Sequence, residues 1–151
     1  QLVCPPNLMF MYMPSHLNHM IFELMKNSLR AVVERYGVER EDHYPPIKVI
    51  VVEGKEDITI KISDEGGGIP RSEVPLVWTY TYTTAQPDDL DPDFQTSDFL
   101  APMAGFGYGL PLARLYARYF GGDLKLISME GYGTDVYLHL NRLSSSSEPL
   151  P

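Results

Sequence analysis

The apolar positions of this chain follow two spacings, and each spacing predicts a different kind of element. Between about His16 and Tyr36 apolar residues recur every three or four positions, which is the pattern of an amphipathic helix. Ser15 is the expected N-cap of this helix, and Gly37 is the expected residue just beyond its C-terminus. The preceding apolar run, residues 8–13, favours a short strand or an extended lead-in.

Strand patterns occur in two pairs. The segments "IKVIVVE" (47–53) and "DITIKIS" (57–63) are rich in β-branched residues and are separated by "GKE", so they predict a hairpin. The segments "DLKLISME" (123–130) and "TDVYLHL" (134–140) flank "GYG" and predict a second hairpin. The segment "LPLARLYARYFGG" (110–122) predicts a second amphipathic helix that ends at its glycine pair.

Regular patterning is lost between the first hairpin and the second helix. Residues 71–82 favour a short helical or irregular stretch. Residues 86–104 hold three prolines and five aspartates, which is typical of a long loop that serves as a lid or stays disordered. The order of elements predicts an α/β (α+β) two-layer sandwich, in which two helices cover one face of a mixed, largely antiparallel sheet, rather than a Rossmann sheet.

Composition narrows the class of protein. The chain has 151 residues with 44% hydrophobic and 21% charged residues, as expected for one globular domain. Its net charge of −8 argues against a nucleic-acid binder or an anionic-membrane binder. No apolar run approaches the roughly 20 residues of a membrane span. The single Cys4 excludes an internal disulfide, and the initial Gln1 leads us to expect a part of a longer protein.

Five polar residues interrupt the first predicted helix. At about 100° per residue they fall in one stripe roughly 100° wide, namely His19, Glu23, Lys26, Asn27 and Arg30. The commoner interpretation of such a stripe is a solvated helix face. The alternative is the wall of a binding site, with an imidazole, a carboxylate and an amide projecting one turn apart. The apolar remainder of the helix would then pack on the sheet.

The motif "DEGGG" follows the second predicted strand directly. Three successive glycines (Gly66, Gly67 and Gly68) permit positive φ and a close backbone approach. The carboxylate of Asp64 could accept a hydrogen bond from an exocyclic amine such as that of adenine. The alternative is an ordinary Asp-Gly turn.

The motif "GFGYGLP" lies at the start of the second predicted helix. Gly105, Gly107 and Gly109 would expose backbone N–H groups beside a helix N-terminus, which is an anion-binding arrangement. Pro111 suits the first helical turn. The alternative is a flexible hinge.

Threonines lie at the start of the acidic loop and at the start of the last predicted strand. Thr134 could reach a base or could cap a turn. Thr83 and Thr84 could contact a phosphate or the lid, or could simply end a helix.

Taken in order, "ELMKN", "DEGGG", "GFGYGLP" and "GT" resemble the GHKL ATPase/kinase domain, the Bergerat nucleotide fold of histidine kinases, mismatch-repair ATPases, type II topoisomerases and heat-shock chaperones. The stretches "MPSHLNHMIFELMKNSLRA" and "GFGYGLPLARLYARYFGGDLKLISMEGYGTDVYLHL" further resemble the mitochondrial pyruvate dehydrogenase kinases, closest to the plant type. These are serine kinases. The resemblance implies a nucleotide-binding domain over residues 1–143, an ATP lid at 86–104 and a flexible tail at 144–151.

The resemblance also implies catalytic roles. Glu23 would be the general base that takes the proton from the substrate serine, and His19 would orient or tune it. Asn27 would ligate Mg²⁺, while Lys26 and Arg30 would balance charge near the phosphates.

The implied cofactors are ATP or ADP with Mg²⁺, and K⁺ is a further candidate. Asp64 would read the adenine amine, and the glycines of "GFGYGLP" would cradle the phosphates. The full set implied to contact the nucleotide or its metal is Asn27, Arg30, Asp64, Gly66, Gly68, Thr83, Thr84, Gly105, Phe106, Gly107, Tyr108, Gly109, Leu110 and Thr134.

The implied partners are the serine-bearing α subunit of pyruvate dehydrogenase as substrate and a second copy paired through the sheet. The family also binds the lipoyl domain of the acetyltransferase core through an N-terminal helical bundle, which this chain lacks, so we expect nucleotide binding rather than kinase activity from the chain alone. The implied location is the mitochondrial matrix. The alternatives are a branched-chain ketoacid dehydrogenase kinase and a non-catalytic nucleotide-binding module, and the intact Glu23 and Asn27 count against the second.

Overall fold

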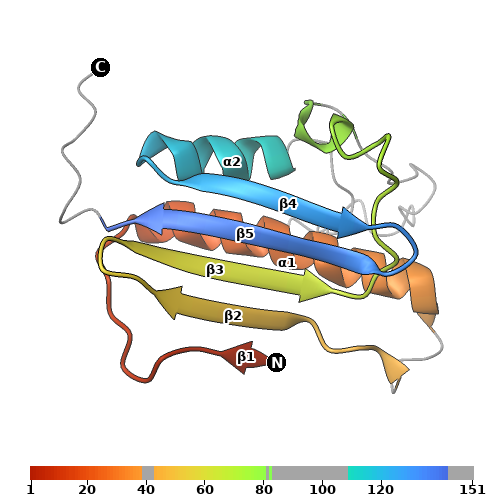
Figure 1. Cartoon of the computed structure of the whole chain (residues 1–151), viewed down its shortest axis with the longest axis horizontal. Coiled ribbons are helices and arrows are strands. Elements are labelled where there is room, and N and C mark those ends of the chain that lie inside the picture. The colour runs from red at the N-terminus through yellow and green to blue at the C-terminus, as the bar shows by residue number, and fades with distance from the viewer. Residues whose placement is uncertain (39–42, 81, 83–108, 143–151) are drawn as a thin grey trace, which may run out of the picture.

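A five-stranded sheet forms the frame of the part of the chain that the computed structural model describes, which is residues 1–38, 43–80, 82 and 109–142 (Figure 1). The strand order is β1-β2-β3-β5-β4. The β1–β2 pair is parallel and the other neighbours are antiparallel, so the sheet is mixed as predicted. The strands are β1 (Leu2–Val3), β2 (Lys48–Glu53), β3 (Asp57–Asp64), β4 (Asp123–Met129) and β5 (Gly133–Asn141).

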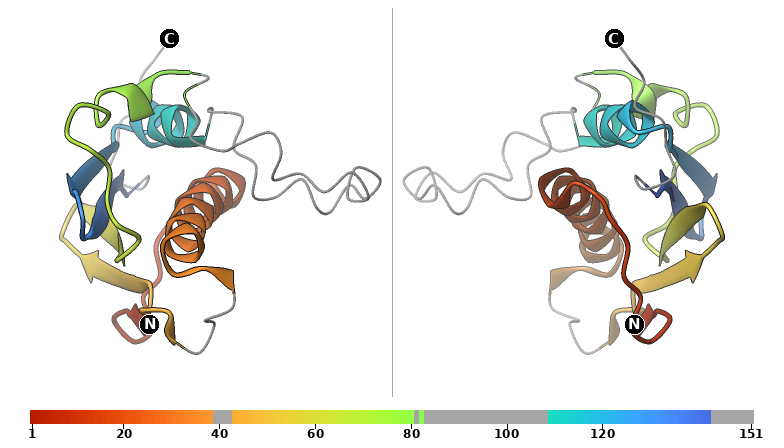
Figure 2. Two further views of the ribbon diagram at one scale, coloured as in Figure 1. Left: turned by 90° about the vertical axis from the view of Figure 1, so that its right-hand side faces the viewer. Right: turned by 90° about the vertical axis from the view of Figure 1, so that its left-hand side faces the viewer.

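Two α-helices form the second layer. The long helix α1 (Pro14–Tyr36) and the shorter α2 (Gly109–Tyr119) lie on the same face of the sheet (Figure 2). A short 3₁₀ helix, η2 (Leu76–Trp78), lies in the connection that the sequence predicted to be short helical or irregular. The two-layer α/β sandwich is therefore confirmed. No described helix is long and apolar enough to cross a membrane.

The core lies between the helices and the sheet. Along β3 every second residue is buried, beginning at Ile58, and β5 follows the same alternation from Val136 to Leu140. On α1, Met20 and Leu24 are one turn apart and both are fully buried. Strand period and helix period therefore direct apolar side chains into one shared layer.

The predicted ends of α1 are half right. Gly37 has φ +77° and its N–H donates to the Val33 carbonyl oxygen at 2.8 Å, as expected for a helix C-terminus. Ser15 is not the N-cap, because the helix already begins at Pro14 and Met13 occupies the capping position without a side-chain hydrogen bond. The fixed φ of proline and its missing N–H suit a first helical residue, so proline rather than serine starts this helix.

Of the two alternatives for residues 8–13, the structure excludes the strand: these residues lead into α1 without regular structure, and Leu2–Val3 pairs with β2 instead. One further sequence expectation is wrong. The apolar remainder of α1 does not all pack on the sheet, since the side chains of Phe22 and Leu29 are 58% and 46% exposed. Both lie on the side of α1 that faces away from the core, where a wheel drawn from sequence cannot show whether an apolar side chain has a partner.

Candidate functional site

A cavity of about 270 Å³ opens between α1, the end of β3, the start of β5 and the first residues of α2. Its size approaches that of small-molecule sites. Its walls come from segments far apart in the sequence, and they include many of the predicted site residues. Those predicted residues are Glu23, Asn27, Arg30, Asp64, Gly66, Gly68, Gly109, Leu110 and Thr134.

Asp64 lines the cavity beside Ser28 and Gly66, and this part of the lining is called the Asp64 end below. Its side chain is only 7% exposed, and its Oδ1 accepts hydrogen bonds from the backbone N–H groups of Gly66 (3.0 Å) and Thr134 (3.3 Å). Burial raises the pKa of the Asp64 carboxyl, and these two amides together with the Ser28 hydroxyl partly offset that rise. The result is a buried carboxylate whose orientation is set by two β-strand ends and one helix.

The glycines after Asp64 are required for two different reasons. Gly68 has φ +71°, and a Cβ there would lie 2.1 Å from the Met129 carbonyl oxygen. Gly66 does not have positive φ, but a Cβ on it would lie 2.4 Å from the Cβ of Ala31 in α1. Gly66 therefore allows the loop to approach α1 closely. Within "DEGGG", positive φ occurs only at Gly67 and Gly68.

Thr134 belongs to a short hydroxyl network. Its Oγ1 lies 3.0 Å from the Oγ of Ser128 on the neighbouring strand, and that same Oγ accepts the backbone N–H of Ile69 at 2.7 Å. The threonine thus faces the cavity beside Asp64, its partner in the β3–β5 register.

Glu23 lines the cavity beside Gly109, and it comes before Ser28 along α1. Lys26 Nζ lies 2.9 Å from each of its two carboxylate oxygens, and both side chains are 13% exposed. The first residue of α2, Gly109, lies against the same carboxylate. Asn27 lines the wall between Glu23 and the Asp64 end, and Arg30 pairs with Glu34 at 2.6 Å. The predicted polar stripe thus contributes three cavity residues.

His19 and Lys26 are not among the described residues that line the cavity. The His19 ring contacts Tyr116 of α2 edge-to-face at 5.3 Å between ring centres, and its Nε2 is buried without a hydrogen-bond partner. The orienting role expected of His19 therefore stays a prediction.

Several predicted features lie outside the described residues. These are the lid at 86–104, the tail at 144–151, and Thr83, Thr84, Gly105, Phe106, Gly107 and Tyr108. Within the described residues no group of three or more His, Cys, Asp or Glu side chains could hold a metal ion.

Sequence reasoning missed four residues in or beside the cavity lining. Ser28 is buried on the face of α1 assigned to packing, and its place beside Asn27 in "KNS" was the available signal. Ser128 supports Thr134 and gave no signal. Glu73 and Tyr82 also line the cavity, and the Tyr82 hydroxyl donates to Glu73 at 2.6 Å.

The amino-acid sequence matches a known family of ATPases. Residues 13–144 match the sequence model of the family described as histidine kinase-, DNA gyrase B-, and HSP90-like ATPase. The chain therefore belongs to this ATPase family, and the predicted GHKL fold is confirmed.

Similarity to individual proteins is more specific. The chain is 66% identical to a protein of Schizosaccharomyces pombe over 99% of its length, and 60% identical to one of Arabidopsis thaliana over 97%. Both are named mitochondrial [pyruvate dehydrogenase (acetyl-transferring)] kinase. Identity to isozyme 3 of that kinase from Homo sapiens is 56% over 93% of the chain. The resemblance to pyruvate dehydrogenase kinases is thus confirmed. The chain spans 36%, 40% and 33% of these relatives, respectively.

Proposed function

We propose that this chain is the ATP-binding catalytic domain of a mitochondrial protein serine kinase that phosphorylates and inactivates pyruvate dehydrogenase. The observation that carries the proposal is one cavity whose lining holds Asp64 beside Ser28 and Glu23 beside Gly109, with Asn27 between Glu23 and Ser28 on α1. Its support from outside the structure is the 66% identity to a named kinase of this type.

The base of ATP fits the Asp64 end. A buried carboxylate whose Oδ1 is already bonded by two amides has its remaining acceptor capacity for the exocyclic amine of adenine. Thr134 and the backbone at Gly68 line the same end and would fix the plane of the ring. Desolvation strengthens this contact, because a buried acceptor has no competing water.

The phosphates fit the end formed by Asn27 and the N-terminus of α2. Backbone N–H groups at the start of a helix favour anions, and Gly109 keeps this end free of a side chain. The Asn27 side chain offers the oxygen ligand that Mg²⁺ prefers, and Mg²⁺ bound by one such ligand and by phosphates keeps several waters. Once bound, the ion would neutralise charge on the transferred phosphoryl group.

Glu23 is the proposed general base. Its carboxylate would accept the proton of the substrate serine hydroxyl as that oxygen bonds to the γ-phosphorus and the bond to the ADP oxygen breaks. Lys26 holds both carboxylate oxygens at 2.9 Å, which fixes the base in one orientation. Arg30 would balance phosphate charge from the same helix.

The partners of the proposed kinase are the α subunit of pyruvate dehydrogenase and a second copy of the chain. The sheet face opposite the helices carries exposed apolar side chains on its outer strands, including Val52, Ile127 and Met129, which favours pairing through that face. We further propose that the whole kinase binds the lipoyl domain, that K⁺ binds at the site, and that the protein is located in the mitochondrial matrix.

The first test is calorimetric titration of this chain with Mg-ADP, beside an Asp64→Ala variant. We expect the parent to bind and the variant to lose most of its affinity, while circular dichroism shows both to be folded. A folded parent that binds no Mg-ADP would contradict the proposal. Equal binding by both proteins would show that Asp64 does not contact the adenine base.

A further inference from the structure

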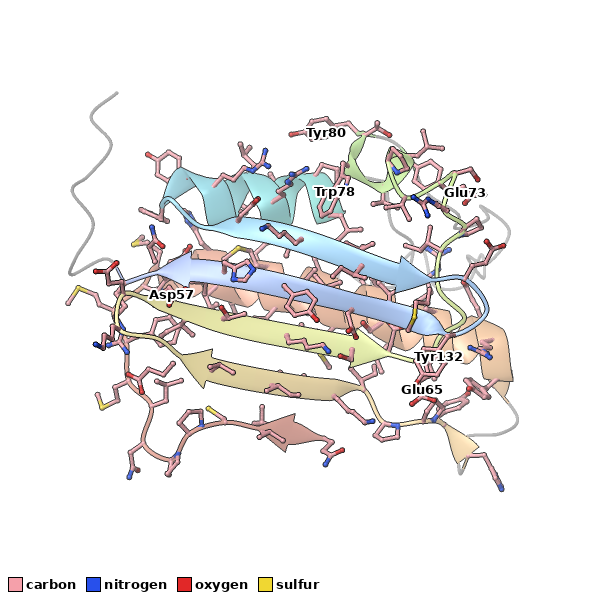
Figure 3. The ribbon with its side chains drawn as sticks, viewed as in Figure 1. Asp57, Glu65, Glu73, Trp78, Tyr80 and Tyr132 are labelled. Atoms are coloured by element: carbon pink, nitrogen blue, oxygen red, sulfur yellow. The ribbon has the colours of Figure 1, made fainter. Side chains whose placement is uncertain are left out.

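The guanidinium of Arg35 joins the last turn of α1 to two loops that meet beside the cavity. Its Nη1 donates to the carbonyl oxygens of Glu65 (3.0 Å) and Tyr132 (2.6 Å), and its Nη2 donates to that of Gly131 (3.1 Å). Figure 3 shows Glu65 and Tyr132 close together where β3 ends and β5 begins. One side chain therefore spans the "DEGGG" loop and the β4–β5 turn.

The two loops also bond directly to each other. The N–H of Gly67 donates to the Tyr132 carbonyl oxygen at 3.0 Å, and the N–H of Gly131 donates to that of Gly67 at 2.7 Å. Arg35 binds the Tyr132 and Gly131 carbonyls from the helix side, and its Cδ lies 3.6 Å from where a Cβ of Gly67 would be. The charge-assisted bonds of the planar guanidinium favour this one arrangement of the loops.

The same two loops orient Asp64. Glu65, whose carbonyl Arg35 binds, is the residue after Asp64, and Gly66 supplies one of the two amides on the Asp64 carboxylate. Thr134, which supplies the other amide, lies two residues beyond Tyr132. Arg35 thus binds a carbonyl close in sequence to each of the two N–H groups that orient the Asp64 carboxylate. Arg35 itself does not line the cavity.

We propose that Arg35 is a positioning residue for nucleotide binding, which holds the two loops so that Asp64 selects the amino group of an adenine base. The inference rests on the proposed function, because it takes adenine as the group that Asp64 contacts. Arg35 acts through the loops, so its loss should change the preference for adenine more than it changes the contacts to the phosphates.

The test compares Arg35→Ala and Arg35→Lys with a matched control, Arg118→Ala. Arg118 is the basic residue in the last turn of α2, as Arg35 is in α1, and it pairs with Asp123 at 2.9 Å, with neither residue in the cavity lining. Each protein is titrated calorimetrically with Mg-ADP and with Mg-IDP, whose base carries an oxygen in place of the amino group. Amide hydrogen exchange is measured on the ligand-free chain.

We expect Arg35→Ala to bind Mg-ADP about tenfold more weakly and to lose most of the preference for ADP over IDP. Arg35→Lys keeps a positive charge at the helix end but not the fork of donors, so it should keep the parent's melting temperature and still lose the preference. Arg118→Ala should keep both affinities within about twofold. Exchange at the Gly67 and Gly131 amides should accelerate only in the Arg35 variants.

Each contrary result has a distinct meaning. Unchanged base preference in a folded Arg35→Ala variant overturns the inference while the proposed function stands. A folded parent that binds neither nucleotide overturns the proposed function and the ligand part of the inference. In that case the exchange data still decide whether Arg35 holds the two loops together, since that measurement needs no ligand.

Discussion

Gly109, the first residue of α2, lies so close to Glu23 that a Cβ built on it would be 2.3 Å from the Glu23 Oε2 atom. The backbone of Gly109 has no positive φ, so conformation alone does not require glycine there. The Glu23 carboxylate on the opposite wall, which Lys26 holds in place, occupies the space that a side chain at position 109 would need. The proposed base and the start of the phosphate-side helix are therefore in direct contact.

Replacing Gly109 with alanine tests this contact. The methyl group would lie against the Glu23 carboxylate and take up space at the proposed phosphate end of the cavity, so we expect Mg-ADP affinity to fall about tenfold. The melting temperature should stay unchanged or rise, because alanine is the better helix former. Leu115→Ala, at an exposed position of the same helix, is the control. A Gly109→Ala variant with parent affinity would show that the carboxylate moves aside freely.

Glu23→Gln in the full-length protein separates binding from catalysis. The amide keeps the size of the side chain but cannot accept the serine proton, so we expect phosphate transfer to pyruvate dehydrogenase to fall about a hundredfold or more. Mg-ADP binding should persist, because the adenine end is untouched. Radiolabel transfer and calorimetry on the same preparation measure both. Substantial transfer by the variant would remove Glu23 from the role of base, and no transfer by the parent would favour a non-catalytic module.

Asp64→Asn gives a prediction for stability against pH. Burial raises the pKa of the Asp64 carboxyl above its ordinary 3.8, so the folded state binds this proton more tightly than the unfolded state. The free energy of unfolding of the parent therefore falls, through this group, as pH rises from about 3.8 through the raised pKa. Asparagine does not titrate and can keep the same amide bonds through its oxygen. We expect the variant's advantage in stability to grow across that window.

Urea unfolding of parent and Asp64→Asn at closely spaced pH values from 3.5 upward measures this difference. Other ionisable groups contribute equally to both proteins and cancel. A stability difference that stays constant or shrinks as pH rises would contradict the assignment of a buried, costly charge to Asp64. The variant should also lose Mg-ADP affinity, since its amide presents N–H groups where the adenine amine needs an acceptor.

The proposed dimer makes a prediction about the uncovered sheet face. Ile127 is 59% exposed on β4 and is paired across the strands with Asp135. If two copies meet through this face, Ile127→Glu would place a charge in the interface, and we expect sedimentation to show a dimeric parent and a monomeric variant at micromolar concentration. Leu115→Glu adds the same charge at an exposed position on the helical side and should leave the dimer intact. A monomeric parent would end the proposal for this chain.

Local patterns predicted the elements well because their causes are local. Alternation along β3 and helical spacing along α1 follow from backbone geometry, and Gly37 ends α1 as glycine commonly does. The N-terminus was harder to predict. Residues 8–13 look like a strand, but Leu2–Val3 takes the β2 edge, and no property of either segment alone decides between them.

The candidate site was likewise predicted only in part from the sequence. Taken singly, "ELMKN", "DEGGG" and "GT" were ambiguous, and the resemblance of their order to a known family named Glu23, Asn27, Asp64 and Thr134. All four line one cavity in the structure. The helix wheel placed His19 in the same stripe, yet the structure places its ring against Tyr116 of α2. Whether a polar side chain faces a cavity or another helix depends on which segment packs beside it.

By itself, then, the sequence determined most of the elements, their order and the fold class, because these follow from short-range periodicity and residue type. Through its resemblance to a known family it also named the candidate site residues. Only the tertiary structure decided which of those residues share one cavity, why Gly66 must lack a side chain, how close Gly109 lies to Glu23, and that Arg35 bonds to carbonyls as far as 97 residues away. These relationships are contacts of a few ångströms between distant segments. They arise when the helices pack on the sheet, and no local pattern encodes them.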